Sequence, residues 1–365
     1  MASTLLIGSC EPFSGKSAVV LGLGRQLLKR GVDLRFGKPL ATNVESSTDH
    51  CDRPLIDPDV RFVGATLGLP DGSLIPSLDV LEPNVAQQRL LDANLDPGEG
   101  LNQLRQQLAA APPGSLCLLE AAGSLQEGLL YGLSLPQLVS SLDASVLLVH
   151  PWSDSRSVDP LIAAQQRLGD RLLGLVLNAV NPSAVAALRQ QEVPALEHMG
   201  LPVMGVLPRS PLLRSVTVEE LARRLEAEVL CCPDRLDLLV ETLSIGAMNV
   251  NSAMEFFRRR RNMAVVTGAD RTDIQLAALE ASTQCLILTG VGEPLPQLVS
   301  RAEELEVPLL KVERDTLTTV EVVEQAFGHV RLHEAVKATY AIRLVEEHCN
   351  FEGLYSHFGL AGPAH

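Results

Sequence analysis

Aromatic residues are scarce in this chain, since Phe, Trp and Tyr make up only 3% of its 365 residues. Its cores must therefore be built mainly from aliphatic side chains. Basic residues are also few, with 30 Lys and Arg against 44 Asp and Glu and a formal net charge of −14. Nucleic acids and anionic membranes both require a basic surface on the proteins that bind them. We therefore expect neither as a partner.

Metal-binding, disulfide and targeting patterns are missing as well. The seven cysteines include no C-x-x-C pair, and the eight histidines show no metal-ligand spacing. An odd number of cysteines within apolar segments is typical of a reducing compartment. The N-terminus leaves no room for a signal peptide before the first apolar run, and no run approaches the length of a membrane span. These absences predict a cytoplasmic protein without a zinc site.

What remains is the composition of a folded protein, with 46% hydrophobic and 20% charged residues and a length suited to two or three domains. In the N-terminal part, short apolar segments alternate with helical patterns, which predicts a parallel sheet covered by helices on both faces. Strands are expected at residues 5–7, 34–36, 116–119, 146–149, 173–177 and 203–206. Helices are expected at residues 16–30, 59–67, 84–91, 102–110, 134–142 and 158–168. The segment 41–83 is interpreted as an active-site loop around the short helix at 59–67.

The pattern changes after residue 209. We expect an amphipathic helix at 216–228, a linker at Cys-Pro-Asp (232–234), strands at 262–268, 285–290 and 307–312, and helices at 319–326 and 332–348. The first two of these strands end in Thr-Gly, 22 residues apart, and should end at the same sheet edge. The four arginines at 258–261 are interpreted as a solvated helix end, with an anion site or subunit contact as the alternative.

The clearest functional signal is the sequence Gly-Ser-Cys-Glu-Pro-Phe-Ser-Gly-Lys-Ser at residues 8–17. It follows an apolar strand and closes on Gly-Lys-Ser where a helix begins, an arrangement whose backbone amides and helix N-terminus bind phosphates. Lys16 would reach the terminal phosphates, and the Ser17 hydroxyl would bind Mg²⁺. The usual pattern has glycine where this chain has Cys10, so an ordinary strand–turn–helix is the alternative.

Polar residues follow other strands of the same predicted sheet, at the edge where open α/β sheets bind ligands. Lys38 follows the second strand and either projects over bound phosphates or lies in solvent. Glu120 ends a buried strand, where an unpaired carboxylate is costly, and this favours a metal contact. Asp59 is either a further metal contact or a helix cap. Asn178 either reads an adenine edge or is a turn asparagine.

In chain order the motifs are Gly-Lys-Ser, Lys-Pro, Asp, Glu-Ala-Ala-Gly, Asn-Ala-Val-Asn and Val-Leu-Pro-Arg. Over residues 1–213 this order resembles the dethiobiotin synthetase-like branch of the P-loop NTPases, which includes the cobyrinic acid a,c-diamide synthases. The resemblance implies an ATP site with Mg²⁺. Nucleotide-binding residues would be Gly8, Ser14, Gly15, Lys16, Ser17, Asn178 and Pro208. The metal would be held by Ser17, Asp59 and Glu120, and the catalytic residue would be Lys38, in contact with the γ-phosphate and an activated carboxyl group.

The chain departs from that family in three places. Its cradle is one residue longer than in dethiobiotin synthetase. The family's Glu-Gly-Ala-Gly-Gly becomes Glu-Ala-Ala-Gly-Ser at residues 120–124, which places a methyl group where backbone must approach closely. Residues 40–42 also lack the glycine-bearing stretch that holds the biotin precursor. These changes are compatible with nucleotide binding and disfavour dethiobiotin synthesis itself.

The sequence Thr-Gly-Ala-Asp-Arg-Thr-Asp at residues 267–273 resembles the DRTGG domain. The matching motif residues are Gly268, Asp270, Arg271 and Thr272, while the following Gly-Gly is replaced by Asp-Ile. Asp270 is expected to cap the next helix. Arg271 is a candidate contact for an anion or another subunit.

Together the two resemblances are those of the N-terminal half of the long phosphate acetyltransferases, whose acyl-transfer chemistry lies in a separate C-terminal domain. Because the chain ends at His365, acetyltransferase activity is not expected. The expected domains are a P-loop domain (1–213), a connecting helix and linker (214–235), a smaller α/β DRTGG-like regulatory domain (236–349) and a tail (350–365).

Three functions fit these motifs. The first is a regulatory or sensory Mg-ATP-binding protein, with or without slow ATP hydrolysis, whose DRTGG domain binds a small effector or assembles a homo-oligomer and which acts on a metabolic partner enzyme. The second is an ATP-dependent ligase that activates a carboxylate. The third is an interaction protein whose nucleotide site has decayed. The retained motifs argue against decay, and no substrate pocket is specified beside Lys38. We therefore rank regulation first and the ligase second.

Overall fold

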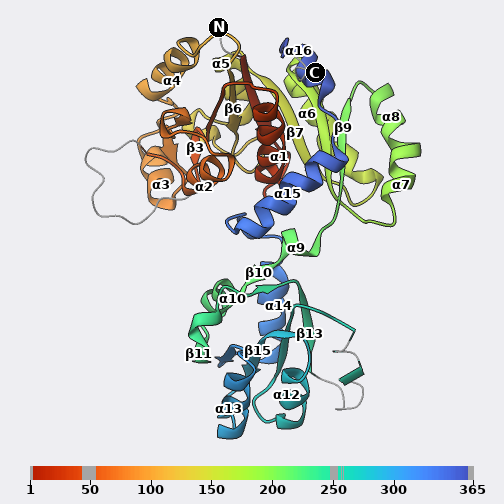
Figure 1. Cartoon of the computed structure of the whole chain (residues 1–365). Helices are drawn as coiled ribbons and strands as arrows, with labels where there is room; N and C mark the ends of the chain where they lie inside the picture. Colours follow the sequence, from red (N-terminus) through yellow and green to blue (C-terminus); the bar gives the residue numbers. More distant parts are fainter. Residues whose placement is uncertain (1–2, 43–54, 247–253, 256, 258, 361–365) are drawn as a thin grey trace. The chain divides into compact units, whose positions relative to one another are not determined.

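The computed structural model describes residues 3–42, 55–246, 254–255, 257 and 259–360. Its internal contacts divide the chain into unit 1 (Met1–Arg209 and Leu332–His365) and unit 2 (Ser210–Arg331) (Figure 1). The division expected from the sequence differs in two respects. Residues 214–235 lie within unit 2 instead of forming a linker, and the segment from residue 332 belongs to unit 1.

Unit 1 contains a parallel sheet whose described strands have the order β4-β2-β6-β1-β7-β8-β9. Their bounds are β1 (Ser3–Gly8), β2 (Leu34–Gly37), β4 (Leu74–Ile75), β6 (Leu116–Glu120), β7 (Ser145–Pro151), β8 (Leu172–Val180) and β9 (Val203–Pro208). The buried strand β1 lies between β6 and β7, where the chain order of the strands changes direction. The predicted P-loop-type fold class is confirmed, and the carboxyl end of β1 is the place where such sheets bind ligands.

Helices cover both faces of this sheet (Figure 1). They are α1 (Lys16–Lys29), α2 (Pro58–Leu67), α3 (Pro83–Leu91), α4 (Glu99–Ala109), α5 (Leu135–Leu142), α6 (Val158–Leu168), α7 (Val185–Ala187), α8 (Val193–His198), α15 (Ala335–His348) and α16 (Glu352–His357). The predicted strands and helices of residues 1–209 are all present, with ends shifted by at most three residues. The sequence did not predict β4, α7, α8 or the short pair β3 (Leu40–Ala41) and β5 (Asp79–Val80).

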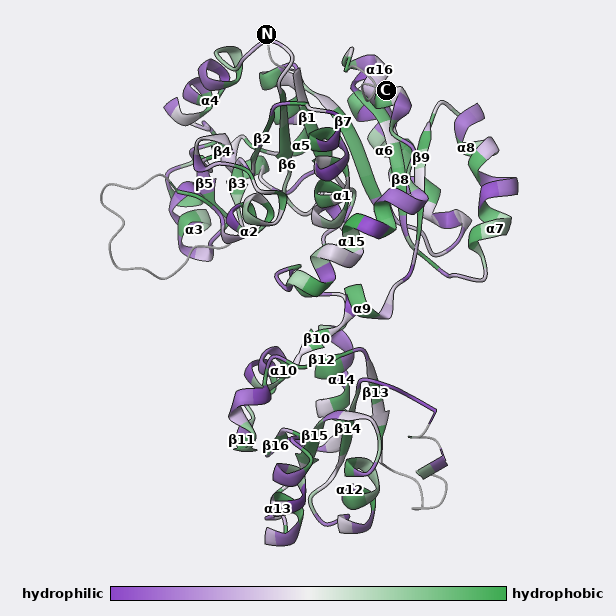
Figure 2. Cartoon of the chain, viewed as in Figure 1, coloured by the Kyte–Doolittle hydropathy of each residue, from purple (hydrophilic) through white to green (hydrophobic). Residues whose placement is uncertain are grey.

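Aliphatic side chains fill the core, as the shortage of aromatics requires. Leu6, Leu119 and Leu148 of the central strands join leucines of α4, α5 and α6 in one buried cluster. Figure 2 shows the hydrophobic residues concentrated in the strands of each sheet. Burial of the central strands stabilises the sheet. The sheet in turn determines the position in space at which each strand ends.

The C-terminal segment packs on α1 of the same unit. Gly22 of α1 allows the approach, because a Cβ built there would lie 2.3 Å from the Cβ of Val345 in α15. The Tyr355 hydroxyl donates a hydrogen bond to Oε1 of Gln26 at 2.9 Å. Local periodicity predicted the helix, but it carries no information on which unit the helix packs against. For this reason the sequence placed the segment from residue 332 in the DRTGG-like domain, whereas it belongs to unit 1.

Gly22→Ala should destabilise unit 1 by about 1–3 kcal/mol through overpacking, although alanine normally favours a helix over glycine. The readout is urea unfolding followed by fluorescence of the single tryptophan, Trp152, which is buried in unit 1. The control is Gly72→Ala, where an added Cβ meets nothing within 4 Å. A Gly22→Ala variant as stable as the wild type would contradict this packing.

Unit 2 contains a sheet of order β11-β16-β15-β14-β13, in which β11 is antiparallel and the other neighbours are parallel. The strands are β11 (Glu228–Cys231), β13 (Thr242–Ile245), β14 (Met263–Gly268), β15 (Thr283–Thr289) and β16 (Leu309–Val312). The helices are α9 (Pro211–Arg214), α10 (Val218–Leu225), α12 (Thr272–Leu279), α13 (Pro296–Glu304) and α14 (Thr316–Ala326), and β10 (Val216–Thr217) pairs with β12 (Leu239–Val240). Gly268 pairs with Thr289, so β14 and β15 end at the same edge, as predicted.

The helix predicted at 216–228 is shorter than expected. It begins at Val218 because Oγ1 of Thr217 caps it, accepting from the Glu220 amide at 3.2 Å. It ends where Glu226 adopts a positive φ of 54°. The next residues form the edge strand β11, with the Cys231 side chain in a hydrophobic cluster. The Cys-Pro-Asp segment is therefore part of unit 2 and not a linker.

The arginine run follows helical residues, in keeping with the predicted helix end. Arg258 lies outside the described residues. Arg259 pairs with Glu255 one turn earlier at 2.5 Å, and Arg260 donates to the Leu243 carbonyl at 3.0 Å. In the described part of the chain, each of the cysteines is a free thiol, and none of the helices has both the length and the apolar character needed to cross a bilayer.

Candidate functional site: a cradle beside buried charges

The predicted cradle connects β1 to α1. Gly8 ends β1, and Gly15 immediately precedes α1 with a φ of 93°, a left-handed conformation that favours glycine. A Cβ at Gly15 would also lie 2.2 Å from Nδ2 of Asn178. Cys10, at the position where the usual pattern has glycine, directs its thiol to the Pro160 carbonyl at 3.5 Å. The geometry therefore requires glycine directly before Lys16 but not at position 10.

Neighbouring strand ends hold the cradle in place. The Ser9 hydroxyl donates to the Gly123 carbonyl beyond β6 at 2.9 Å. Nδ2 of Asn178, in β8, donates to the Ser14 carbonyl at 2.7 Å. Asn178 is thus bound to the cradle and is not a turn asparagine. The Ser14 hydroxyl is buried and has no hydrogen-bond partner among the described residues.

Glu120 ends β6 directly beside the cradle, with only 4% of its surface exposed. Its Oε1 accepts a hydrogen bond from the Ser17 hydroxyl at 3.2 Å, whereas its Oε2 has no partner among the described residues. Burial raises the pKa of Glu120, and the nearby Lys38 and Lys16 act in the opposite direction. A buried carboxylate oxygen next to a serine hydroxyl suits a cation such as Mg²⁺, which binds through one or two carboxylates together with phosphate oxygens.

Lys38 is buried among acidic groups at the end of β2. Its Nζ lies 2.7 Å from Oδ2 of Asp59 and 3.5 Å from Oδ2 of Asp57, and it donates to Oγ1 of Thr42 at 2.8 Å. Burial alone lowers the pKa of Lys38, but the carboxylates of Glu120, Asp59 and Asp57 outweigh it and raise the pKa overall. The ammonium group therefore stays charged inside the protein.

Lys16, at the first position of α1, lies in a different electrostatic environment. Burial lowers its pKa, Glu120 partly offsets this effect, and Lys38 adds to the lowering. A phosphate group in the cradle would supply the negative charge that this buried lysine lacks.

Asp57, and not Asp59, caps α2. Oδ1 of Asp57 accepts from the Asp59 amide at 2.8 Å, and its Oδ2 accepts from the Thr42 amide at 2.8 Å. The Asp59 carboxylate therefore does not act as a cap. Besides Lys38, it contacts Nε2 of His333 at 2.7 Å. The ring of His333 stacks on Phe62, with 5.5 Å between the centroids.

The structure thus brings together Lys16, Ser17, Lys38, Asp59 and Glu120, with Asn178 on the far side of the cradle. Pro208 ends β9, where it pairs with Val180 of β8. Sequence reasoning missed Asp57, Thr42 and His333. The Asp-Pro pair at 57–58 is a recognisable helix start, whereas His333 is distant in sequence and gives no local signal. Within the described ranges, no three His, Cys, Asp or Glu side chains form a ready-made metal cluster.

In unit 2, the DRTGG-like turn follows β14. Its first residue, Gly268, ends the strand, and Arg271 occupies the position before α12, which begins at Thr272. The helix has no side-chain cap, so the prediction that Asp270 caps it is wrong. The turn is held instead by Gln275, whose Nε2 donates to the Gly268 carbonyl at 2.8 Å.

Two family models match the chain, one after the other. Residues 3–217 match the family model described as an AAA domain. The chain belongs to this AAA domain family. Residues 220–326, within unit 2, match the DRTGG domain. The predicted combination of a P-loop domain and a DRTGG domain is therefore confirmed.

Curated relatives align with most of the chain. The phosphate acetyltransferase of Nitratidesulfovibrio vulgaris is 26% identical over 378 residues, and that of Synechocystis is 24% identical over 387 residues. Each alignment covers 98% of this chain and 52% of the relative, so the chain spans about half the length of these relatives. The chain is also similar to the hydrogenobyrinate a,c-diamide synthase of Rhizobium meliloti, with 29% identity over 214 residues, 58% of this chain and 42% of that protein.

Two solved structures show more distant likeness. The septum site-determining protein MinD of Pyrococcus horikoshii, complexed with Mg-ADP, is 16% identical with a TM-score of 0.35, over 59% of this chain and 84% of that one. The CBS and DRTGG domains of Clostridium perfringens pyrophosphatase, complexed with diadenosine tetraphosphate, are 18% identical with a TM-score of 0.28, over 46% and 70%.

Glu120→Gln should flatten the pH dependence of stability. A carboxyl group whose folded pKa lies above its ordinary 4.5 binds more protons in the folded than in the unfolded state, so stability falls as pH rises from about 4.5 upward. Glutamine lacks this titration, and the ligand-free variant should be at least as stable as the wild type near neutral pH. Urea unfolding at several pH values, with the exposed Glu197→Gln as control, measures this. A variant that is less stable yet keeps the wild-type pH profile would contradict the prediction.

Proposed function

We propose that unit 1 binds Mg-ATP and that the protein is a regulatory or sensory ATP-binding protein. The observation that carries the proposal is the cradle next to Glu120. The buried Oε2 of Glu120 lacks a partner within the described part of the chain, and its other oxygen accepts from the Ser17 hydroxyl. A metal ion held by Ser17 and Glu120 and by phosphate oxygens would meet this need. The bound Mg²⁺ would supply positive charge against the phosphates.

The other side chains have corresponding roles in this proposal. Lys16 donates to the terminal phosphates, which supply the charge it lacks. Asn178 and Pro208, at the ends of β8 and β9, contact the base. Asp59 contacts the metal ion, and Lys38 contacts the γ-phosphate.

Regulation is favoured because Asp59 and Lys38 are already engaged. The Asp59 carboxylate is shared between Lys38 and His333, each at 2.7 Å. A metal ion with its bound water would compete with both contacts. His333 lies two residues beyond Arg331, where the polypeptide leaves the DRTGG-containing unit. Nucleotide binding would therefore act on the segment through which the chain returns from unit 2, whose DRTGG domain would bind a small effector or assemble copies of the chain.

Lys16→Ala should abolish detectable ATP binding while leaving the fold intact, because the phosphates lose a buried cation. Calorimetric titration of ATP with and without Mg²⁺ is the measurement. Lys29→Ala is the matched control, since that lysine lies on the same helix with 63% of its side chain exposed. Failure of the wild-type protein to bind ATP at millimolar concentration would refute the proposed function.

His333→Ala should tighten Mg-ATP binding about 2- to 10-fold, because the metal ion no longer competes with a hydrogen bond to Asp59. Affinity for ATP in EDTA should not change. The half-exposed His333 can be replaced without opening the core. Equal affinities for Mg-ATP in wild type and variant would show that this contact does not limit binding.

A carboxylate-activating ligase is the second candidate. It is favoured by the similarity to hydrogenobyrinate a,c-diamide synthase and by a charged Lys38 beside the cradle. ATP turnover in the presence of a panel of carboxylate metabolites distinguishes the two functions. A steep rise with one carboxylate favours the ligase, and turnover that stays slow with every carboxylate favours regulation.

A further inference from the structure

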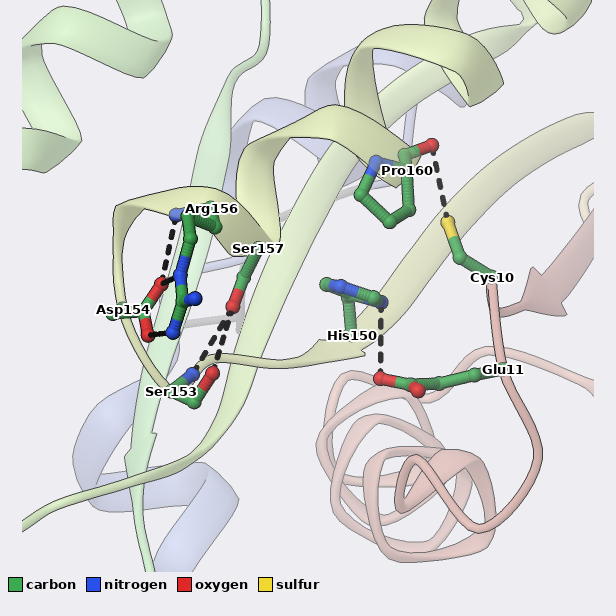
Figure 3. A pocket seen from close by; sticks show the side chains of 8 residues that line it. All are labelled: Cys10, Glu11, His150, Ser153, Asp154, Arg156, Ser157 and Pro160. Atoms are coloured by element: carbon green, nitrogen blue, oxygen red, sulfur yellow. Dashed lines mark hydrogen bonds and ion pairs between the residues drawn. The ribbon is translucent and has the colours of Figure 1, made fainter.

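A polar pocket of about 370 Å³ opens beside the cradle (Figure 3). Cys10 and Glu11 line it from the cradle, and the remaining lining residues come from the end of β7 and the beginning of α6. Because β7 and β6 flank β1 on opposite sides, this pocket is separate from the cluster at Glu120. Its volume lies within the range of small-molecule sites.

Most polar groups of the pocket already have partners. The Arg156 guanidinium pairs with Asp154 through two contacts of 3.0 and 2.7 Å, so the two charges offset each other. The hydroxyls of Ser153 and Ser157 lie 3.2 Å apart and share a hydrogen bond. Burial raises the pKa of Cys10 to about 12, so its side chain is a neutral thiol.

Two groups face each other in the pocket without such partners. His150 is only 3% exposed, and its Nδ1 has no hydrogen-bond partner among the described residues. That nitrogen lies 3.9 Å from Oε1 of the half-exposed Glu11, which is too far for a hydrogen bond. Figure 3 shows the imidazole directed at this carboxylate across the pocket.

The buried imidazole favours its neutral form. Burial lowers the pKa of His150 below its ordinary value, although Glu11 acts in the opposite direction. A neutral imidazole that carries its proton on Nε2 has a lone pair on Nδ1 and accepts hydrogen bonds there. In that tautomer, a neutral nitrogen and a carboxylate face each other across the pocket.

We propose that this pocket binds a small molecule through a primary ammonium group, which donates hydrogen bonds to the Glu11 carboxylate and to Nδ1 of His150. An ammonium group is compact and carries three donors, so it can satisfy both acceptors at once. It also balances the charge of Glu11, the one charge that the Arg156–Asp154 pair does not offset. An anion would meet two acceptors and is disfavoured. The side chains of Glu11 and His150 are not among the predicted phosphate and metal contacts, although Glu11 belongs to the cradle, and the test below keeps this proposal distinguishable from the proposed function.

The test uses the full-length protein with ¹³C-labelled histidine and propylamine as the probe. The His150 resonance, assigned with His150→Gln, should shift saturably with propylammonium and not with tetramethylammonium, a cation without N–H donors. Glu11→Gln should weaken binding at least 10-fold by analogy with charge-assisted hydrogen bonds, and Glu197→Gln should leave it unchanged. Lys16→Ala should retain amine binding while losing ATP binding, which separates this test from that of the proposed function.

Four results would overturn the proposal. The first is a folded wild-type protein with no saturable shift in propylamine. The second is an equal response to tetramethylammonium, which would indicate unspecific cation attraction. The third is a saturable response to inorganic phosphate instead of the amine, and the fourth is unchanged amine affinity in Glu11→Gln. Circular dichroism of Glu11→Gln excludes misfolding as the cause of a loss, and the half-exposed position of this residue makes the substitution mild.

Discussion

The carboxyl group of Glu120, enclosed at the end of a central strand, has to be compensated if it is to carry charge, and the surrounding elements are arranged to do this. Lys16, at the start of α1, and Lys38, directly after β2, both lie near this carboxyl group. The charge of Lys38 is itself balanced by Asp57 and Asp59. Each charge in the cluster makes the next one tolerable inside the protein. The network therefore reaches from the cradle through α2 to the C-terminal segment.

In the proposed function, this network gives the ligand-free protein a set of contacts that a bound nucleotide would rearrange. A phosphate would draw Lys38 away from Asp59, and a metal ion would draw Asp59 away from His333. Binding at such a site is coupled to the position of the groups it displaces. A protein evolved only to hold ATP would gain nothing from engaging its metal contact in advance, whereas a sensor would gain two distinguishable states.

Local sequence patterns predicted the elements of unit 1 well, because the burial of a strand and the periodicity of a helix depend on residues that are close together in sequence. They also led us to expect Lys16, Ser17, Lys38 and Glu120 near one another, since parallel strands bring their carboxyl ends to one edge, and the roles of these residues stay predictions. What they missed depends on long-range packing. The site contact of His333 and the packing of α15 on α1 arise from residues some three hundred positions away in sequence, which no local window contains. For Asp59 the sequence left a metal contact and a helix cap open, and the structure shows that the cap of α2 is Asp57, the aspartate directly before the proline.

The return of the C-terminal segment to unit 1 has a consequence for how the protein is made. The face of α1 around Gly22 stays uncovered until α15 and Tyr355 have been synthesised, long after the P-loop sheet has left the ribosome. A fragment that ends at residue 217, the limit of the AAA domain match, would keep an apolar helix face open to water. In this protein, the boundary of the AAA domain match and the boundary of unit 1 are different, because the segment after residue 331 completes the packing of that unit.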